Sequence, residues 1–211
     1  MAAELERIKA MAEYGDAAAQ NNLCIAYYSG NGVEQNYARA LQWCLKSAEQ
    51  GNRDAQFNAG LIYQNAPGAD VDYTRAMHWY RQAAEQEHAA AAFNVGVMYQ
   101  QGEGVEADSS QAYQWYRQSA EAGFAEAQYN LAILYQQGSG VAPHTGNARQ
   151  WYKAAAEQGH ASAQYNLGMM HERDIVVFSE SRELALKWYR KAAEQGHAIA
   201  RESLLELQAG D

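Results

Sequence analysis

All five tryptophans of this 211-residue chain lie at nearly one interval, and that interval constrains the fold more than any other feature. They are Trp43, Trp79, Trp115, Trp151 and Trp188, with spacings of 36, 36, 36 and 37 residues. An alanine and an asparagine precede each tryptophan at the same period, and an Ala-Glu pair follows it. Self-similarity at such a period predicts a solenoid of repeated supersecondary units rather than one globular domain.

Within each period the apolar residues recur with helical spacing, in two segments. In the second copy, Ala55, Ala59 and Tyr63 fall on one face of a first helix, and Trp79 and Ala83 on one face of a second. A turn that contains glycine in most copies separates the two helices. We therefore predict an all-α fold of five antiparallel helical hairpins at residues 15–50, 51–86, 87–122, 123–158 and 159–195.

The two ends of the chain follow the same pattern. Residues 1–14 align with a second helix and residues 196–211 with a first helix. We expect a capping helix at each end, so that 1–211 forms one complete repeat domain.

Composition excludes several classes of protein. The formal net charge of −9 has the wrong sign for binding nucleic acid or an anionic membrane, both of which reward clustered Lys and Arg. Two cysteines are too few for a disulfide-built miniprotein or for a zinc site of three or four thiolates. No apolar run approaches the roughly 20 residues of a membrane-spanning helix, so we expect no membrane insertion.

The repeated strings resemble a known family. They read Ala-x-Tyr-Asn-Leu-Gly-x-x-Tyr-x-x-Gly-x-Gly-Val and then Ala-x-x-Trp-Tyr-x-x-Ala-Ala-Glu-x-Gly-His, which is similar to the Sel1-like repeat, a relative of the tetratricopeptide repeat. The resemblance covers nearly the whole chain and implies a right-handed α/α superhelix. It also implies a non-enzymatic adaptor or scaffold role; bacterial members include immunity proteins against secreted toxins.

We predict no catalytic residue, no metal site and no cofactor. The Gly-x-Gly segments at 30–32, 102–104 and 138–140 occupy equivalent turns and lack the lysine of a phosphate-binding loop. His88, His160 and His197 share one position in repeats about 10 Å apart, too far for joint metal ligation. A cysteine-rich branch of the family has been associated with β-lactam binding. Its paired cysteines would align with Gln56 and Ala48, so an enzyme of that kind is our least favoured alternative.

The two cysteines both lie in the first repeat. Cys24 replaces the mid-helix glycine or alanine of the other copies, and Cys44 replaces the tyrosine after the tryptophan. The larger residue on one helix offsets the smaller one on the other, so we predict that the two positions pack together. We favour a pair of buried thiols, with a disulfide as the alternative.

Three further features of the consensus carry expectations. Mid-helix glycines predict a close approach of two helices; they are Gly60, Gly96 and Gly168. Glu87 stands where most other repeats have a glycine after the helix end, which predicts a left-handed residue there. One asparagine per repeat favours a structural role, bonding loop backbone within its repeat, over a peptide clamp; these are Asn22, Asn58, Asn94, Asn130 and Asn166.

By analogy with the tetratricopeptide arrangement, the first helices line a concave groove, in which we expect the partner to bind. The predicted contact residues form an aromatic, an aliphatic and a glutamine row: Phe57, Phe93, Tyr129 and Tyr165; Leu61, Val97, Ile133 and Met169; Gln64, Gln100 and Gln136. An equally weighted alternative is that the aromatic residues pack against the loop of the neighbouring repeat. An apolar strip bordered by glutamines fits a protein or peptide.

The fifth loop departs most from the others. It holds four consecutive apolar residues where most loops have glycines: Ile175, Val176, Val177 and Phe178. We favour packing of this loop onto the core or groove. The alternative is an exposed secondary contact loop.

Together these features predict a monomeric, non-enzymatic adaptor that binds a protein or peptide in its groove. The acidic excess favours a basic partner, with association that weakens in salt. The alternatives are an immunity protein that neutralises a secreted toxin and a structural spacer. The sequence as it stands predicts a cytoplasmic protein, or a periplasmic one if a leader peptide precedes it.

Overall fold

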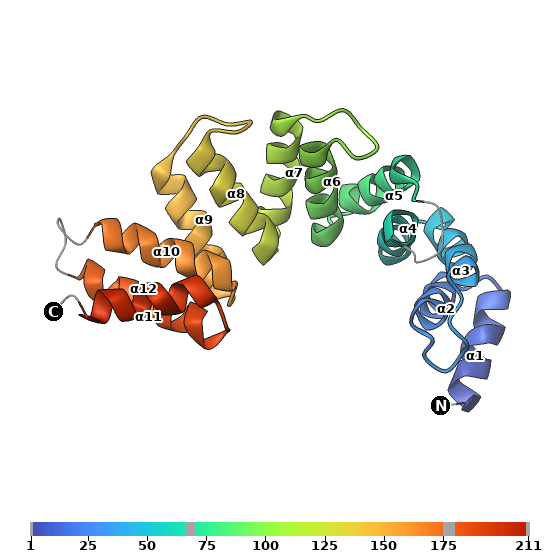
Figure 1. Ribbon diagram of the computed structural model, residues 1–211. Helices are drawn as coiled ribbons and strands as arrows, with labels where there is room; N and C mark the ends of the chain where they lie inside the picture. Colours follow the sequence, from blue (N-terminus) through green and yellow to red (C-terminus); the bar gives the residue numbers. More distant parts are fainter. Residues whose placement is uncertain (1, 66–70, 175–179, 210–211) are drawn as a thin grey trace. The chain divides into compact units, whose positions relative to one another are not determined.

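The computed structural model describes residues 2–65, 71–174 and 180–209, and over these residues the regular structure is entirely α-helical (Figure 1). The helices are α1 (Ala2–Glu13), α2 (Ala17–Ser29), α3 (Tyr37–Glu49), α4 (Arg53–Asn65), α5 (Tyr73–Glu85), α6 (Ala89–Gln101), α7 (Ser109–Glu121), α8 (Ala125–Gln137), α9 (Thr145–Glu157), α10 (Ala161–Arg173), α11 (Ser181–Glu194) and α12 (Ala198–Ala209). The predicted all-α fold of repeated hairpins is confirmed.

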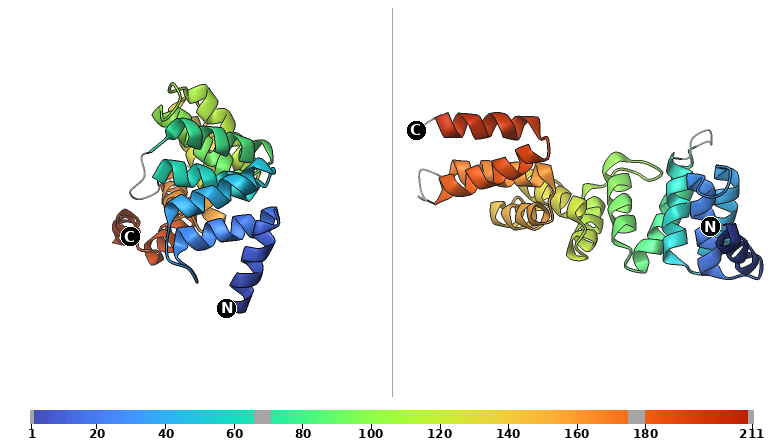
Figure 2. Two further views of the ribbon diagram at one scale, coloured as in Figure 1. Left: turned by 90° about the vertical axis from the view of Figure 1, so that its right-hand side faces the viewer. Right: turned by 90° about the horizontal axis from the view of Figure 1, so that it is seen from below.

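The chain divides into two compact units, residues 1–115 and residues 116–211, with the division inside α7. In the first unit α2 packs on α3 and α4 on α5, and the hairpins stack through α3 on α4 and α5 on α6. In the second unit α8 packs on α9 and α10 on α11, with α9 on α10 and α11 on α12. The views of Figure 2 show these hairpins from two further directions. Within each unit, these helices therefore contact their neighbours in sequence.

The helix ends follow the residues predicted for them. Asn36 and Asp72 precede α3 and α5, and the side chain of each accepts a hydrogen bond of 2.9 Å from the backbone N–H three residues on. Glycines with positive φ end many of the helices, as Gly51 does at 86°. Glu87 is the one non-glycine residue with positive φ in the described part of the chain, at 61°, which confirms its predicted left-handed conformation.

The deepest large side chain of each repeat from the second onward is the tyrosine that follows the tryptophan. Tyr80 and Tyr152 are at most 1% exposed, whereas Trp79 and Trp151 are half-buried. The tyrosine fits because the facing helix has a small residue: a Cβ atom on Gly60 would lie 2.6 Å from the ring of Tyr80. The same close approach joins Gly168 and Tyr189. The approach predicted from these two mid-helix glycines is confirmed.

Candidate functional site

The buried tyrosine of one repeat ties that repeat to the next through its hydroxyl group. Tyr80, on α5, donates a hydrogen bond of 2.7 Å to Oε1 of Gln64 on α4, and its hydroxyl also bonds the side chain of Asn94 on α6. Tyr152 repeats this arrangement, with Gln136 at 2.8 Å and with Asn166. We call each such set of a buried tyrosine, its glutamine and the next repeat's asparagine a tyrosine junction.

Burial keeps these hydroxyl groups neutral. It raises the pKa of Tyr152 to about 12, and it raises the pKa of Tyr80 well above its ordinary value, although the asparagine bonds oppose the shift. The phenols therefore act as neutral hydrogen-bond donors and acceptors at physiological pH.

These bonds settle the role of the asparagines in the tyrosine junctions. The predicted structural role is confirmed for Asn94, Asn130 and Asn166, which bond Tyr80, Tyr116 and Tyr152 respectively. The expected partner was wrong: each side chain reaches a tyrosine of the preceding repeat rather than loop backbone of its own.

The aromatic row of the predicted groove lies between successive repeats. Phe57 stacks on His88 with ring centroids 4.5 Å apart, and Tyr129 stacks on His160 at 4.4 Å. Tyr165 and His197 form a third such pair at 4.8 Å. These contacts agree with the alternative that the aromatic residues pack against the neighbouring repeat. Phe57 and Tyr129 still remain half-buried, so part of each ring stays accessible.

His88 and His160 also cap the helices that follow them. The Nδ1 atoms of His88 and His160 accept hydrogen bonds of 3.2 and 3.1 Å from the backbone N–H groups of Ala91 and Ala163, which caps α6 and α10. Burial lowers the pKa of both imidazoles, which must be neutral at Nδ1 to accept. Across the described residues, no three His, Cys, Asp or Glu side chains gather as a metal site would require.

A chain of glutamine hydrogen bonds links neighbouring helices at the same ends, near the N-termini of the first helices. Gln56, buried on α4, donates to the carbonyl of Ala48 at 3.2 Å and accepts from Gln86 at 2.8 Å. Gln128 and Gln164 make the equivalent pair of bonds in the second unit. Sequence reasoning missed this network, although the repetition of glutamine at both positions marks it. Where the cysteine-rich branch would place its disulfide, this chain has a hydrogen bond between Gln56 and Ala48.

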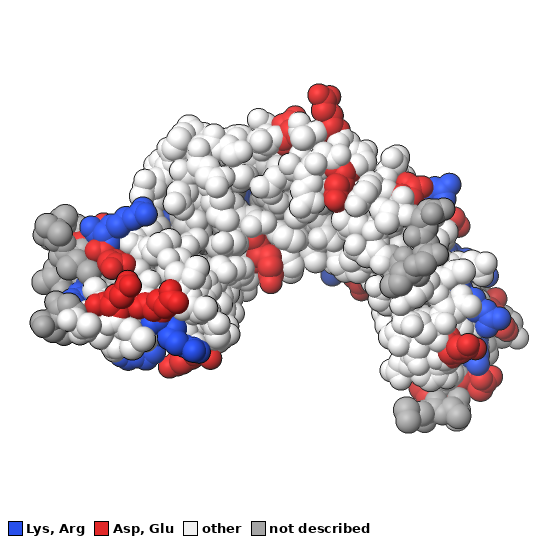
Figure 3. All heavy atoms as spheres, in the orientation of Figure 1, with Lys and Arg blue, Asp and Glu red and all other residues white. Residues whose placement is uncertain are grey.

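The aliphatic row stays partly accessible on the first helices. Its members are half-buried: Leu61, Val97, Ile133 and Met169. Gln100 and Gln136 beside them are exposed, and Phe93 is half-buried like the other aromatic residues of the row. Helices α2 and α6 contain no charged residue. Figure 3 shows broad areas of uncharged surface between scattered groups of charged side chains.

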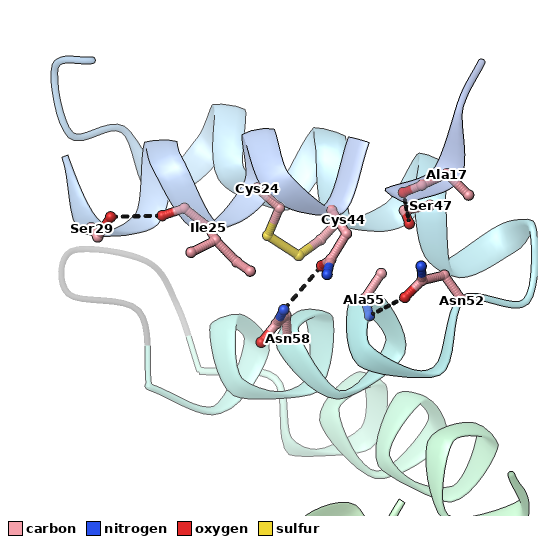
Figure 4. The surroundings of a disulfide bond; sticks show 10 residues. Ala17, Cys24, Ile25, Ser29, Cys44, Ser47, Asn52, Ala55 and Asn58 are labelled. Carbon is pink, nitrogen blue, oxygen red and sulfur yellow. Dashed lines mark hydrogen bonds between the residues drawn. A yellow bond between two sulfur atoms is a disulfide. The ribbon is translucent and has the colours of Figure 1, made fainter. Parts of the chain in front are cut away.

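The first repeat differs from the others at its centre, and here our favoured prediction was wrong. Cys24 on α2 and Cys44 on α3 do pack together, as expected, but they form a disulfide rather than two thiols (Figure 4). Volume compensation explains why these two positions meet and says nothing of their oxidation state. The disulfide replaces the pair of a small residue and a tyrosine that the second repeat has in Gly60 and Tyr80.

A pocket of about 110 Å³ opens beside this disulfide. It is lined by Cys24, Ile25, Tyr28, Asn58, Leu61 and Ile62, so it lies between α2 and α4. Ile25 is 48% exposed and Tyr28 37% exposed, which places both at the accessible surface. Leu61 of the predicted aliphatic row lines this pocket, together with Ile25 and Tyr28, which hold the positions of Leu61 and Gln64 in the first repeat.

The predicted secondary contact loop is not tested. Ile175, Val176, Val177 and Phe178 lie outside the described residues. Whether this loop packs on the core or contacts a partner stays a prediction.

The chain belongs to the Sel1 repeat family. The family matches residues 17–52, 53–88, 89–124, 125–160 and 161–197, five consecutive copies whose frame is offset by two residues from the predicted one. The resemblance found in the sequence is confirmed, and the fold is that of a Sel1-repeat α-solenoid. A comparison with curated proteins found no match.

Two solved structures are similar in both sequence and fold. A protective antigen present in uropathogenic Escherichia coli strains, with an SLR fold, is 36% identical with a TM-score of 0.90, over 96% of this chain and 43% of its own. A Sel1 repeat protein from Oxalobacter formigenes is 37% identical with a TM-score of 0.77, over 90% of this chain and 75% of its own. The present chain thus spans less than half the length of the first of these relatives.

A third structure shares the fold alone. An immunity protein from Pseudomonas aeruginosa is 22% identical with a TM-score of 0.54, over 87% of this chain and 67% of its own. Among the described helices, none combines the length and the apolar character that crossing a membrane requires.

Proposed function

We propose that this chain is a non-enzymatic adaptor that binds a protein or peptide partner through the faces that its first helices form in each unit: α2, α4 and α6 in one unit, and α8 and α10 in the other. The observation that carries the proposal is the recurrence there of half-buried apolar side chains, such as Leu61, Val97 and Ile133, at one position per repeat. An apolar strip of this kind with a polar border suits a protein surface. Membership of the Sel1 repeat family supports a scaffold that binds protein.

The tyrosine junctions explain how such a face stays rigid. The Gln64 and Gln136 side chains, expected as partner contacts, already bond Tyr80 and Tyr152. In these two bonds each glutamine acts as an acceptor, and the amide group of Gln64 also donates to Oε2 of Glu103 at 3.4 Å. A preorganised face loses little conformational freedom on binding, which favours affinity.

Charge contributes less to this face than the net charge of −9 led us to expect. With no charged residue in α2 or α6, the acidic excess lies elsewhere in the sequence. A basic partner stays a prediction, with association that would weaken as salt is added.

The test is a pair of substitutions on the first helices, Val97→Gln and Ile133→Gln. The two side chains are half-buried, and glutamine is uncharged and keeps a similar length. We expect a partner recovered with the native chain to bind at least about tenfold more weakly to the variant, since burial of two apolar side chains is lost. Binding would be measured by isothermal titration calorimetry.

The matched control is Gln114→Ala with Lys153→Ala, on the second helices α7 and α9, where both residues are exposed. These changes should leave binding unchanged. Both variants should keep their helical circular dichroism spectrum. Equal affinity of the native chain and the first-helix variant would reject this face as the binding site.

No second function is proposed. The immunity protein that shares this fold does so at 22% identity, which supports the architecture and not a toxin-neutralising role.

A further inference from the structure

We propose that the pocket beside the Cys24–Cys44 disulfide is an anchoring pocket of the partner-binding face: it takes up one apolar side chain of the bound protein, and an oxygen of that protein accepts a hydrogen bond from Asn58. This inference rests on the proposed function and adds to it the position and chemistry of one contact.

The second repeat shows what normally fills this space. The ring of Tyr80 packs on Gly60, and its hydroxyl group lies between Gln64 and Asn94. Tyr80 is fully buried there. The chain thus plugs the space between two consecutive first helices with a side chain of its own.

The first repeat has the same surroundings without the plug. Cys24, Tyr28 and Asn58, which line the pocket, are the counterparts of Gly60, Gln64 and Asn94 in the repeat sequence. Cys44 stands in place of the tyrosine and reaches only as far as the disulfide. The outer part of the space, which the ring edge and hydroxyl group would occupy, is left as the pocket.

Asn58 is placed to meet a ligand. Its Nδ2 atom donates to Oδ1 of Asn21 at 3.0 Å, which takes up one of its two N–H groups. Asn58 is half-buried, and it lines the pocket where Asn94 instead meets a tyrosine hydroxyl group. The second N–H group is the counterpart of the one that Asn94 offers to Tyr80.

Size and polarity identify the occupant. The pocket volume of about 110 Å³ is of the same order as the ~150 Å³ apolar cavity that takes up benzene. Its inner end is the disulfide with Ile62, and its edge carries the exposed side chains of Ile25 and Tyr28. A group that enters from outside must therefore present an apolar tip inward and an oxygen near Asn58. A leucine-sized side chain with its own backbone carbonyl meets both requirements.

The pocket is continuous with the proposed binding face. Leu61 lines it and belongs to the aliphatic row, and Ile25 holds the same repeat position on α2 as Leu61 does on α4. Helix α2 carries no charge that an apolar segment would have to desolvate. A few side chains in well-packed, desolvated pockets carry most of the binding energy of many interfaces.

The test fills the pocket with the chain's own tyrosine. In Cys24→Gly with Cys44→Tyr the first repeat takes the glycine and tyrosine of the second. The matched control, Cys24→Ala with Cys44→Ala, also lacks the disulfide but leaves the pocket open. The probe is 4-methylphenol, which reproduces the missing part of the tyrosine, titrated while NMR follows the Asn58 side-chain amide and the Leu61 and Ile62 methyl groups.

We expect 4-methylphenol to shift these signals in the native chain and in the alanine control, and to bind about tenfold or more weakly to the tyrosine variant. If all three proteins bind 4-methylphenol equally, or if these signals of the native chain do not shift, the inference that this pocket binds a ligand is wrong. Unchanged melting of the tyrosine variant relative to the alanine control, or an increase, shows that the variant is folded.

The partner itself separates this inference from the proposed function. The tyrosine variant should bind the partner about tenfold more weakly than the alanine control does. If the tyrosine variant no longer binds 4-methylphenol but binds the partner as tightly as the alanine control does, the pocket does not anchor the partner. The proposed binding face would not be affected by that result. If Val97→Gln with Ile133→Gln also leaves partner binding unchanged, the proposed function fails as well.

Discussion

The first and second repeats join their successors with the same backbone and different chemistry. In the second, a buried phenol spans from α5 to α6 and bonds side chains of two repeats, Gln64 and Asn94. In the first, a disulfide stays within one repeat, between α2 and α3, and the bond from Asn58 to Asn21 joins α2 to α4. The comparison shows that the residue after the tryptophan, Tyr80 or Cys44, determines whether the space between two consecutive first helices is filled by the chain itself or is open to a ligand.

The largest expected effect tests what the disulfide contributes to the first repeat. Cys24→Ala with Cys44→Ala should lower the free energy of unfolding by about 3 kcal/mol, because the bridge closes a loop between residues 20 apart in sequence. Denaturant titration would measure the loss, and hydrogen exchange should locate it in α2 to α4. A reducing agent should destabilise the native chain similarly and the variant not at all. Equal stability of the two proteins would show that packing alone holds this repeat.

A second effect, the dependence of stability on pH, should distinguish the contact between the first and second repeats from that between the second and third. The helix after the first junction is capped by Asn52, which does not titrate, and the helix after the second by His88. Burial places the folded-state pKa of His88 and His160 below the ordinary value of 6.5, so their caps stabilise fully above about pH 6.5. This contribution is lost as the pH falls through the lowered pKa values. Two lost caps cost about 2 kcal/mol.

The measurement compares unfolding free energies at pH 7.5 and pH 5 for the native chain and for His88→Asn with His160→Asn. We expect the variant to lose about 2 kcal/mol less on acidification. Asp54, 3.7 Å from Nε2 of His88, opposes the lowering of the pKa of His88, and Glu126 does the same for His160, so each single variant should show a change in the same direction. Parallel pH profiles of the native chain and the double variant would rule out the histidine caps as the cause.

The smallest expected effect comes from exchanging the residues that follow the C-terminal ends of α3 and α5. Gly51 and Glu87 both have positive φ, at 86° and 61°. Glu87→Gly should stabilise the chain by about 1 kcal/mol, because only glycine adopts this conformation without strain. The mirror change, Gly51→Glu, should destabilise by a similar amount through backbone strain alone, since a Cβ atom there would meet nothing within 4 Å. Thermal melting with effects of the same sign for both changes would contradict this explanation.

The repeat pattern predicted what depends on local sequence. The period placed the helices, the caps at Asn36 and Asp72, and the left-handed residue 87, because each depends on a few adjacent residues. The glycines also predicted the close approach at Gly60, because a glycine inside a helix is unfavourable and recurs where a neighbouring helix needs the space of a side chain.

The candidate site was predicted less completely, because its contacts join different repeats. The row of aromatic residues gave no sign of which face would be covered, and His88 looked like a helix-end residue until its ring was found on Phe57. The pocket depends on the absence of one tyrosine, and sequence reasoning read Cys44 as a matter of volume. A side chain that bonds the next repeat can be inferred only once the stacking of repeats is known.

The fixed spacing of the bonds between repeats has a consequence for how such genes change. The tyrosine and its glutamine are 16 residues apart in both the second and the fourth repeat, and the glutamine pairs are 30 apart. Recombination that inserts one copy of the second or fourth repeat therefore keeps the spacing of these bonds within that copy. The first repeat is the exception, because its two cysteines pair with each other and its Asn21 bonds Asn58 of the second repeat. Copies of it inserted elsewhere would carry a second pocket along the array, whereas copies of the second repeat would lengthen the array without adding one.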